Sequence, residues 1–269
     1  MAKNLKEERL GATNYNNQGC LMKVIEYNGV CNVIVEFQDE YKCKIKTRWD
    51  HFQDGTIRNP YYPTVLGVGM IGIKYQTREN ECHTKEYLTW SHMLRRCYMD
   101  VQNTDNTNIR NRNKTYNDVT CCEEWLLFEN FYEWLHGQEN FKVWKQMPLS
   151  AIDKDILVKG NKVYSPNTCC LVPNYVNLLF IKSDTTRGNL PIGVSIALRC
   201  KTKKYRVRMS EYDKTVFIGQ YADLEEAFQA YKQHKEAYIK QIAQEEYDKG
   251  TISRKCYEAM MRWEVEITD

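Results

Sequence analysis

The chain has 269 residues, and its 38 Lys and Arg against 35 Asp and Glu give a formal net charge of +3. This near balance excludes a polycation that binds its partners through net charge alone. A hydrophobic fraction of 42% supplies enough apolar side chains for a sizeable core, which argues against wholesale disorder.

The N-terminus, Met1 to Arg9, is charged and has no apolar segment behind it, so no secretory signal is predicted. No run approaches the roughly 18 consecutive apolar residues of a membrane span. We therefore expect an intracellular, cytoplasmic protein. The 11 cysteines are then expected to be reduced thiols. Cys97 and the pairs Cys121-Cys122 and Cys169-Cys170 are candidates for a zinc site, but no C-x-x-C spacing occurs, and burial as small apolar residues is the favoured interpretation.

Three modules are predicted: residues 1–78, 79–186 and 187–269. In the first, short apolar runs over 20–27, 33–37 and 41–47 are separated by turn-forming residues, which predicts a small β-meander or barrel. Gly67, Gly69 and Gly72 near its end match the string G-x-G-x-x-G. No clear helix and no acidic partner for a ribose follow, so we interpret this match as coincidental.

The middle module is predicted to combine helices with a hairpin. Apolar residues at helical spacing predict helices over 87–98 and 122–135, and the aromatic side chains of the second are expected in the core. From 152 to 173, two short apolar strands flank a turn at 159–161, and a second turn at Ser165-Pro166 is expected to lead into a helix. The predicted unit is a ββα module with flanking helices.

The third module contains a basic strand. Residues 199–214 hold seven Lys or Arg and two acidic residues. Over 204–210, an alternation of period two places Lys204, Arg206 and Arg208 on one face and apolar residues on the other. A second strand over 215–221 and a helix capped by Asp223 follow. The fold class predicted for the whole chain is α+β.

Three strings carry a resemblance to a known family: W-x-x-M-x-x-R-C (Trp90 to Cys97), C-E-E-W-x-x-F-x-N-F (Cys122 to Phe131) and DKDILVKGNKVYSPNTC (Asp153 to Cys169). In this order they resemble phage-encoded proteins described as HNH homing-endonuclease-like. The C-terminal sheet and helix resemble the ethylene-response-factor DNA-binding module, in which a three-stranded sheet lies in the major groove. The resemblance covers essentially the whole chain.

The resemblance implies a hydrolytic site that uses one divalent metal, Mg²⁺ or Mn²⁺. It places Asp153 at the metal-ligand position, Lys154 at the general-base position, Asn161 near the central Asn and Thr168 at the distal ligand. A protonated Lys is a poor base and a Thr hydroxyl is a poor ligand, so the site is degenerate. Asp155 is a substitute metal ligand. His92 or His136 are substitute bases, although no spacing requires them.

The resemblance also implies that double-stranded DNA is a partner, bound by Arg206, Arg208, Lys204 and Arg199. A solvated strand face without a ligand is the alternative interpretation of these residues. Two functions follow. The first is a phage-type DNA-binding protein that cleaves phosphodiesters if its metal site works, so enzymatic activity stays open. The second is an inactive protein on the same scaffold that binds and inhibits a host nucleic-acid-targeting defence protein or ribonucleoprotein.

Overall fold

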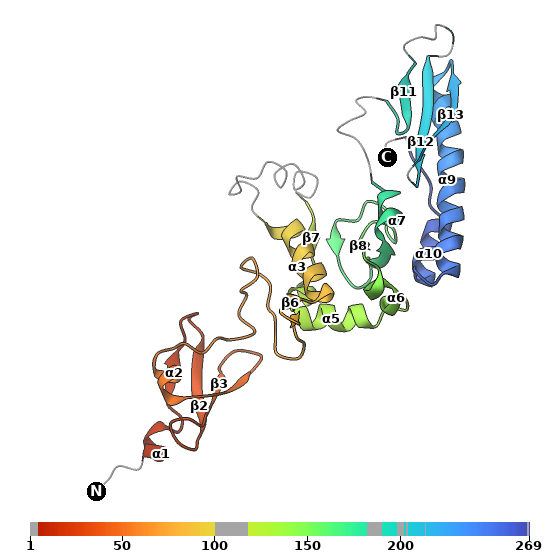
Figure 1. Ribbon diagram of the computed structural model, residues 1–269. Coiled ribbons are helices and arrows are strands. Elements are labelled where there is room, and N and C mark those ends of the chain that lie inside the picture. The colour runs from red at the N-terminus through yellow and green to blue at the C-terminus, as the bar shows by residue number, and fades with distance from the viewer. Residues whose placement is uncertain are drawn as a thin grey trace. The chain divides into compact units, whose positions relative to one another are not determined.

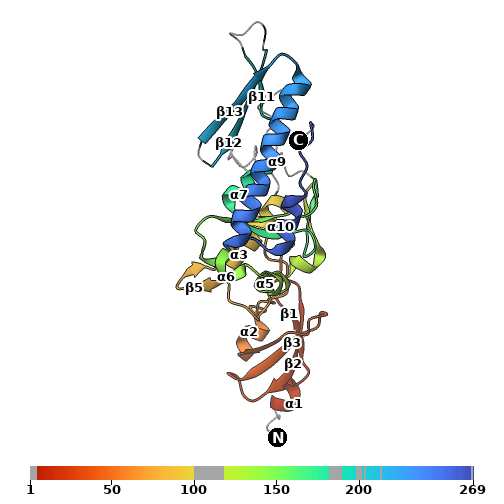
Figure 2. The same cartoon turned by 90° about the vertical axis from the view of Figure 1, so that its right-hand side faces the viewer.

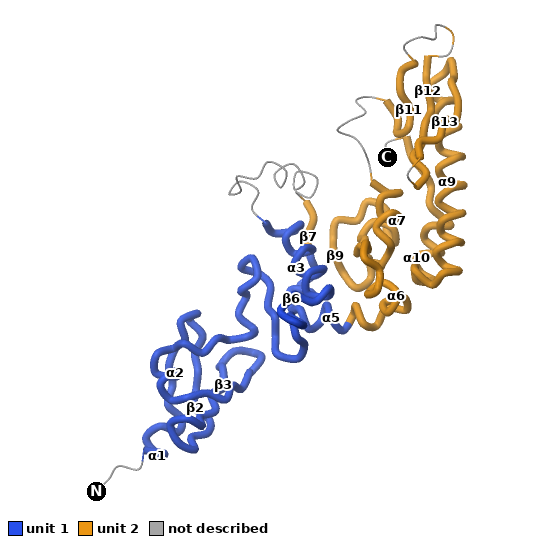
Figure 3. Tube along the Cα trace, viewed as in Figure 1, with its two compact units in different colours: residues 1–117, 121–133 blue, residues 118–120, 134–269 orange. Residues whose placement is uncertain are grey.

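The computed structural model describes residues 5–99, 118–181, 190–197, 202, 204–212, 214–267 and 269. It is a mixed structure of helices and antiparallel sheets, which agrees with the predicted α+β class (Figure 1). The chain divides into two compact units (Figure 3): unit 1 holds residues 1–117 and 121–133, and unit 2 holds residues 118–120 and 134–269. The division into three modules stays a prediction.

Unit 1 begins with a helix and a four-stranded antiparallel meander whose strands pair in the order β1-β2-β3-β4. The elements are α1 (Leu5–Arg9), β1 (Thr13–Tyr15), β2 (Leu21–Tyr27), β3 (Val33–Phe37) and β4 (Lys44–Thr47). Every second side chain of β3 is buried, and Met22 and Val24 of β2 join the same core. The apolar alternation therefore produces a sheet with one buried face.

The rest of unit 1 is mainly helical. Its elements are α2 (Trp49–Gln53), β5 (Arg78–Glu79), β6 (Cys82–His83), α3 (Lys85–Tyr98), the 3-10 helix η2 (Glu123–Leu126) and the start of α5 (Phe128–His136). The helix predicted over 122–135 is thus interrupted at Leu127, whose backbone is extended. Trp125 and Phe128 are fully buried, as their helical spacing predicted. In α3, Met93 and Leu94 are buried, but Leu88 is exposed and Trp90 takes a place in the core that was not predicted.

Unit 2 first forms a long-range hairpin followed by a helix. Its elements are β7 (Thr120–Cys121), α6 (Phe141–Gln146), β8 (Ser150–Asp153), β9 (Val163–Tyr164), β10 (Cys170–Pro173) and α7 (Asn174–Leu178). Strand β8 pairs with β10 and not with the nearer β9. The turn at Ser165-Pro166 leads into β10, so the expectation that it starts a helix is wrong. The helix begins only after Pro173, which is both the last residue of β10, paired with Ser150, and the residue before the first turn of α7.

The C-terminal part of unit 2 is a three-stranded antiparallel sheet with a long helix along one face (Figures 1 and 2). Its elements are β11 (Val194–Ile196), β12 (Tyr205–Glu211), β13 (Lys214–Tyr221), α9 (Leu224–Asp248) and α10 (Arg254–Met261). The carboxylate of Asp223 accepts hydrogen bonds from the N–H groups of Glu225 and Glu226, which confirms the predicted N-terminal cap of α9.

One buried apolar cluster joins the elements of unit 2. It includes Val172 of β10, Val207 of β12, Ile239 of α9 and Met260 of α10. The hairpin and the C-terminal sheet therefore share a core, and the boundary predicted at 186/187 stays a prediction. Among the described helices, none is long and apolar enough to cross a lipid bilayer.

Candidate nucleic-acid interface

The three-stranded sheet has one buried and one exposed face. Val207 and Met209 point toward α9 and are buried, so Arg206 and Arg208, which alternate with them, point away from the helix. The side chain of Arg206 is half-buried and that of Arg208 is exposed. The structure thus places both predicted arginines on a solvent-facing surface.

Cross-strand pairing defines the other residues of this surface. Arg206 lies opposite Ser195 of β11 and Gln220 of β13, and Arg208 lies opposite Phe217 of β13. We call the exposed surface of the sheet the open sheet face, and it consists of Ser195, Arg206, Arg208, Ser210, Thr215, Phe217 and Gln220.

A β-bulge in β13 decides which side chains reach the open sheet face. Phe217 pairs with Arg208 and Gly219 pairs with Val207, so Ile218 has no partner on β12. The extra residue reverses the alternation beyond it and brings Gln220 to the same face as Phe217. Phe217 could have been found from its spacing in the strand, whereas strict alternation assigns Gln220 to the buried face.

The open sheet face carries no carboxylate among its seven members. The nearest acidic residue of β12, Glu211, lies at the strand end and is paired with His234 of α9. Phe217, at 57% exposed, adds an aromatic ring to this surface. Arginines, an amide and an aromatic ring are groups that contact phosphates, base edges and sugars.

The remaining predicted DNA-binding residues lie beside this surface or outside the described residues. Lys204 is exposed and directly precedes β12. Arg199 lies outside the described residues, so the structure gives no position for it.

The four residues predicted for hydrolysis lie in or beside the loop that joins β8 to β10. Asp153, the last residue of β8, is buried, and its Oδ1 accepts hydrogen bonds of 2.7 Å from the backbone N–H groups of Asp155 and Ile156. Burial raises the pKa of Asp153, and these two hydrogen bonds oppose that effect. The carboxylate therefore closes a tight turn at the start of the loop.

Lys154 and Asn161 hold the same loop from its two sides. The buried Lys154 ammonium donates to Asp155 Oδ2 at 2.7 Å and to the carbonyl oxygen of Asn161 at 3.0 Å. The amide of Asn161 in turn donates to the carbonyl oxygens of Lys154 at 2.9 Å and Val163 at 2.7 Å. These side chains are used to fix backbone conformation.

Thr168 completes the bracing of the loop. Its hydroxyl donates to the carbonyl oxygen of Val163 at 2.8 Å and lies 2.8 Å from the hydroxyl of Ser165. The four predicted residues thus belong to one loop, but their polar atoms are turned toward backbone groups of that loop. We name this set of hydrogen bonds, centred on Asp153, Lys154, Asn161 and Thr168, the loop-bracing network.

The loop-bracing network does not fit a divalent metal. One oxygen of Asp153 is saturated by two N–H donors, and the Lys154 ammonium lies against Asp155, the other predicted ligand. A cation so close to the carboxylate would repel a metal ion. Within the described ranges, no group of three or more His, Cys, Asp or Glu that could hold a metal is found, and this includes the cysteines considered for zinc.

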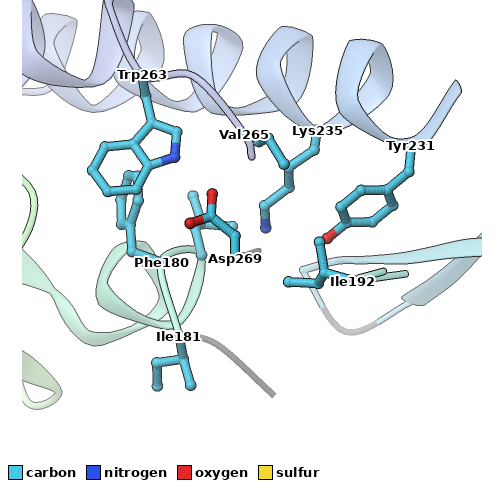
Figure 4. A pocket seen from close by; sticks show the side chains of 9 residues that line it. Phe180, Ile181, Ile192, Tyr231, Lys235, Trp263, Val265 and Asp269 are labelled. Carbon is cyan, nitrogen blue, oxygen red and sulfur yellow. The ribbon is translucent and has the colours of Figure 1, made fainter. Parts of the chain in front are cut away.

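A small pocket in unit 2 lies between α9 and the C-terminal segment (Figure 4). Its volume of about 20 Å³ has room for little more than one water molecule. Phe180 and Trp263 form an apolar side, and Lys235 of α9 points into the pocket. Burial lowers the pKa of Lys235 to about 8. The pocket is too small for an organic ligand, so it is not the candidate site.

Comparison of the chain with protein-family models, with curated proteins and with solved structures gives no match.

Proposed function

We propose that this protein binds double-stranded DNA through the open sheet face. The observation that carries the proposal is the alignment of Arg206 and Arg208 with the exposed ring of Phe217 on a sheet surface free of carboxylates. Cations on such a surface attract the phosphate backbone, while the amide of Gln220 offers both a donor and an acceptor to base edges.

In this proposal the protein is a phage-type, cytoplasmic DNA-binding protein on the HNH-like scaffold that its sequence resembles. Phosphodiester cleavage is not part of the proposed function. The contacts of Asp153 and Lys154 favour a structural role for the degenerate site. A protein or ribonucleoprotein of a host defence complex is the alternative partner, because arginine and aromatic side chains are also enriched in protein interfaces.

The test measures binding of a fluorescently labelled duplex by anisotropy over a salt series of roughly 50 to 200 mM. We expect the double variant Arg206→Ala with Arg208→Ala to bind about tenfold or more weakly, and the plot of log affinity against log salt to lose about 0.9 in slope for each phosphate contact removed. A matched control removes two exposed arginines of α10 and its C-terminal end, Arg254→Ala with Arg262→Ala. This control is expected to bind as the unmodified protein does.

Two results would overturn the proposal. One is wild-type affinity that does not change with salt or cannot be detected. The other is equal loss of affinity in the two double variants, which would assign binding to net charge and not to the open sheet face. In either case the search would turn to protein partners.

A further inference from the structure

Unit 1 contains a larger pocket, of about 320 Å³, beside helix α3. It is lined by residues of α3 between Tyr87 and Arg95, by His83 and by the turn at Leu66. A volume of this size lies at the lower end of the range for small-molecule sites. The pocket belongs to a different unit from the open sheet face, so it is a separate site.

One end of the pocket is cationic and polar. His92 lies three residues before Arg95 on α3, so the two side chains are neighbours on the helix surface. Ser91 also lines this end, but it is buried and its hydroxyl donates to the carbonyl oxygen of Leu88 at 3.1 Å. No carboxylate lines the pocket, and within the described ranges the guanidinium of Arg95 forms no ion pair. Burial, together with Arg95 and Arg96, lowers the pKa of His92, so its ring is neutral near pH 7 and offers one donor and one acceptor.

The other end of the pocket is apolar and aromatic. The ring of His83 stacks on Tyr87, with centroids 4.7 Å apart and an interplanar angle of 28°. Leu66, which is 39% exposed, also lines the pocket. Tyr87 and Arg95 are eight residues apart, which is about 12 Å along the helix axis.

The turn that presents Leu66 is held in an unfavourable conformation. Leu66 has a φ of 55°, in the left-handed region that a branched side chain rarely adopts. Hydrogen bonds between Val65 and Gly69, in both directions, close this turn. A β-carbon on residue 69 would overlap Leu94 and Trp90, so the turn packs closely on α3. The position of Leu66 at the pocket is therefore fixed by the surrounding backbone.

We propose that this pocket binds one nucleotide, with its phosphate at Arg95 and His92 and its base against Leu66 and the stacked rings of His83 and Tyr87. A guanidinium matches a phosphate in charge and in hydrogen-bond geometry, and a neutral histidine ring can donate one further hydrogen bond. A flat base has the shape and the apolar faces to fill the other end, as bases do on aromatic side chains. An inorganic anion alone would leave most of the volume empty.

The experiment is calorimetric titration of the full chain with thymidine 5′-monophosphate, thymidine, inorganic phosphate and a short oligothymidylate. We expect the monophosphate to bind at least tenfold more tightly than thymidine or phosphate. Arg95→Gln is expected to weaken its binding tenfold or more, whereas Arg58→Gln, which changes an exposed arginine of the same unit outside the pocket, is expected to have no effect. Thermal unfolding of both variants checks that they fold.

The oligothymidylate distinguishes a free nucleotide from a nucleotide within a DNA strand as the natural ligand. Tighter binding of oligothymidylate that is lost in Arg95→Gln would assign a nucleotide within a strand, and binding of the monophosphate alone would assign a free nucleotide. No binding of the monophosphate, equal binding of phosphate, or binding unchanged in Arg95→Gln would overturn the proposal. Repeating the titration with Arg206→Ala and Arg208→Ala separates this site from the open sheet face, because the two proposals can then fail independently.

Discussion

The carboxylate of Glu129, in α5, lies in the turn at Gly72, at a place where a β-carbon on residue 72 would overlap it. Glu129 is 2% exposed, and its Oε1 accepts hydrogen bonds from the backbone N–H groups of Ile73 at 2.6 Å and Lys74 at 2.7 Å. The hydroxyl of Tyr61 donates to the same carboxylate, and burial with this charge raises the pKa of Tyr61 to about 12. The turn at Gly72, the last glycine of the G-x-G-x-x-G string, thus binds an anion that the chain itself supplies.

Replacing Gly72 by Ala should destabilise unit 1 far more than the same change at Gly67. Both glycines have positive φ, but only the β-carbon of Gly72→Ala would displace Glu129. Gly67→Ala should cost about 1 to 2 kcal/mol, from backbone conformation alone. Gly72→Ala adds the loss of two buried hydrogen bonds to a charge, on the order of 3 kcal/mol. Urea denaturation measures both, and equal costs would refute the role given to Glu129.

The structural role of Asp153 predicts opposite outcomes for two substitutions. Asp153→Asn keeps an oxygen that can accept from Asp155 and Ile156, and it removes a charge whose burial raises the pKa. Since a raised folded-state pKa means that the ionised form is disfavoured by folding, the free energy of unfolding at pH 7 should be unchanged or higher in Asp153→Asn. Asp153→Ala leaves two N–H groups without an acceptor and should lose about 1 to 3 kcal/mol. Equal losses in both variants would contradict this role.

The loop-bracing network also predicts no metal-dependent cleavage. Supercoiled plasmid incubated with the protein and Mg²⁺ or Mn²⁺ should be neither nicked nor linearised, although a gel shift is expected from the same samples. Cleavage that disappears in Asp153→Asn would show a working metal site and would revise the structural interpretation of Lys154 and Thr168. Cleavage that persists in this variant would point to a contaminating nuclease.

Lys235 predicts a stability change at alkaline pH. Its pKa is lowered from 10.5 to about 8 by burial, so the unfolded chain binds more protons than the folded protein between these values. Stability should therefore rise with pH through this window. Compared with Lys235→Met, the unmodified protein should gain on the order of 2 kcal/mol between about pH 7.5 and pH 10. Urea denaturation at both values tests this, and a constant difference between the two proteins would exclude a buried titrating amine.

Phe217 is expected to contribute affinity without contributing charge. Phe217→Ala should weaken duplex binding several-fold through lost apolar contact and leave the slope of log affinity against log salt unchanged. Leu149→Ala is the control, because Leu149 is 73% exposed and lies outside the open sheet face. A reduced salt slope in Phe217→Ala would indicate that the change disturbs Arg208, which lies opposite.

Local patterns predicted much of the fold. The strands over 20–27, 33–37, 204–210 and 215–221 agree with β2, β3, β12 and β13 to within one residue at each end. The N-terminal cap at Asp223 was also visible, because a cap depends on neighbours within three residues. The alternation that places Arg206 and Arg208 on one face of a strand is likewise a local property.

Features that depend on distant partners were not predicted. The pairing of β8 with β10 joins residues separated by a long loop, and nothing in the loop sequence favours it over the nearer β9. The acceptor role of Glu129 depends on a turn more than 50 residues earlier in the chain. The hydrogen bonds of Lys154 and Thr168 likewise depend on how the loop folds. The family resemblance assigned positions to these two residues but predicted none of their contacts.

The unpaired Ile218 works like a change of reading frame within the sheet. If Ile218 paired with Val207, the residues after it would exchange faces, so the Gln220 amide would turn toward α9 and the ring of Tyr221 would move outward. Deleting Ile218 would instead leave Gln220 opposite Arg206, because the deleted residue is the one without a partner on β12. The irregular pairing of β13 therefore decides that Arg206 lies opposite an amide and not opposite Gly219.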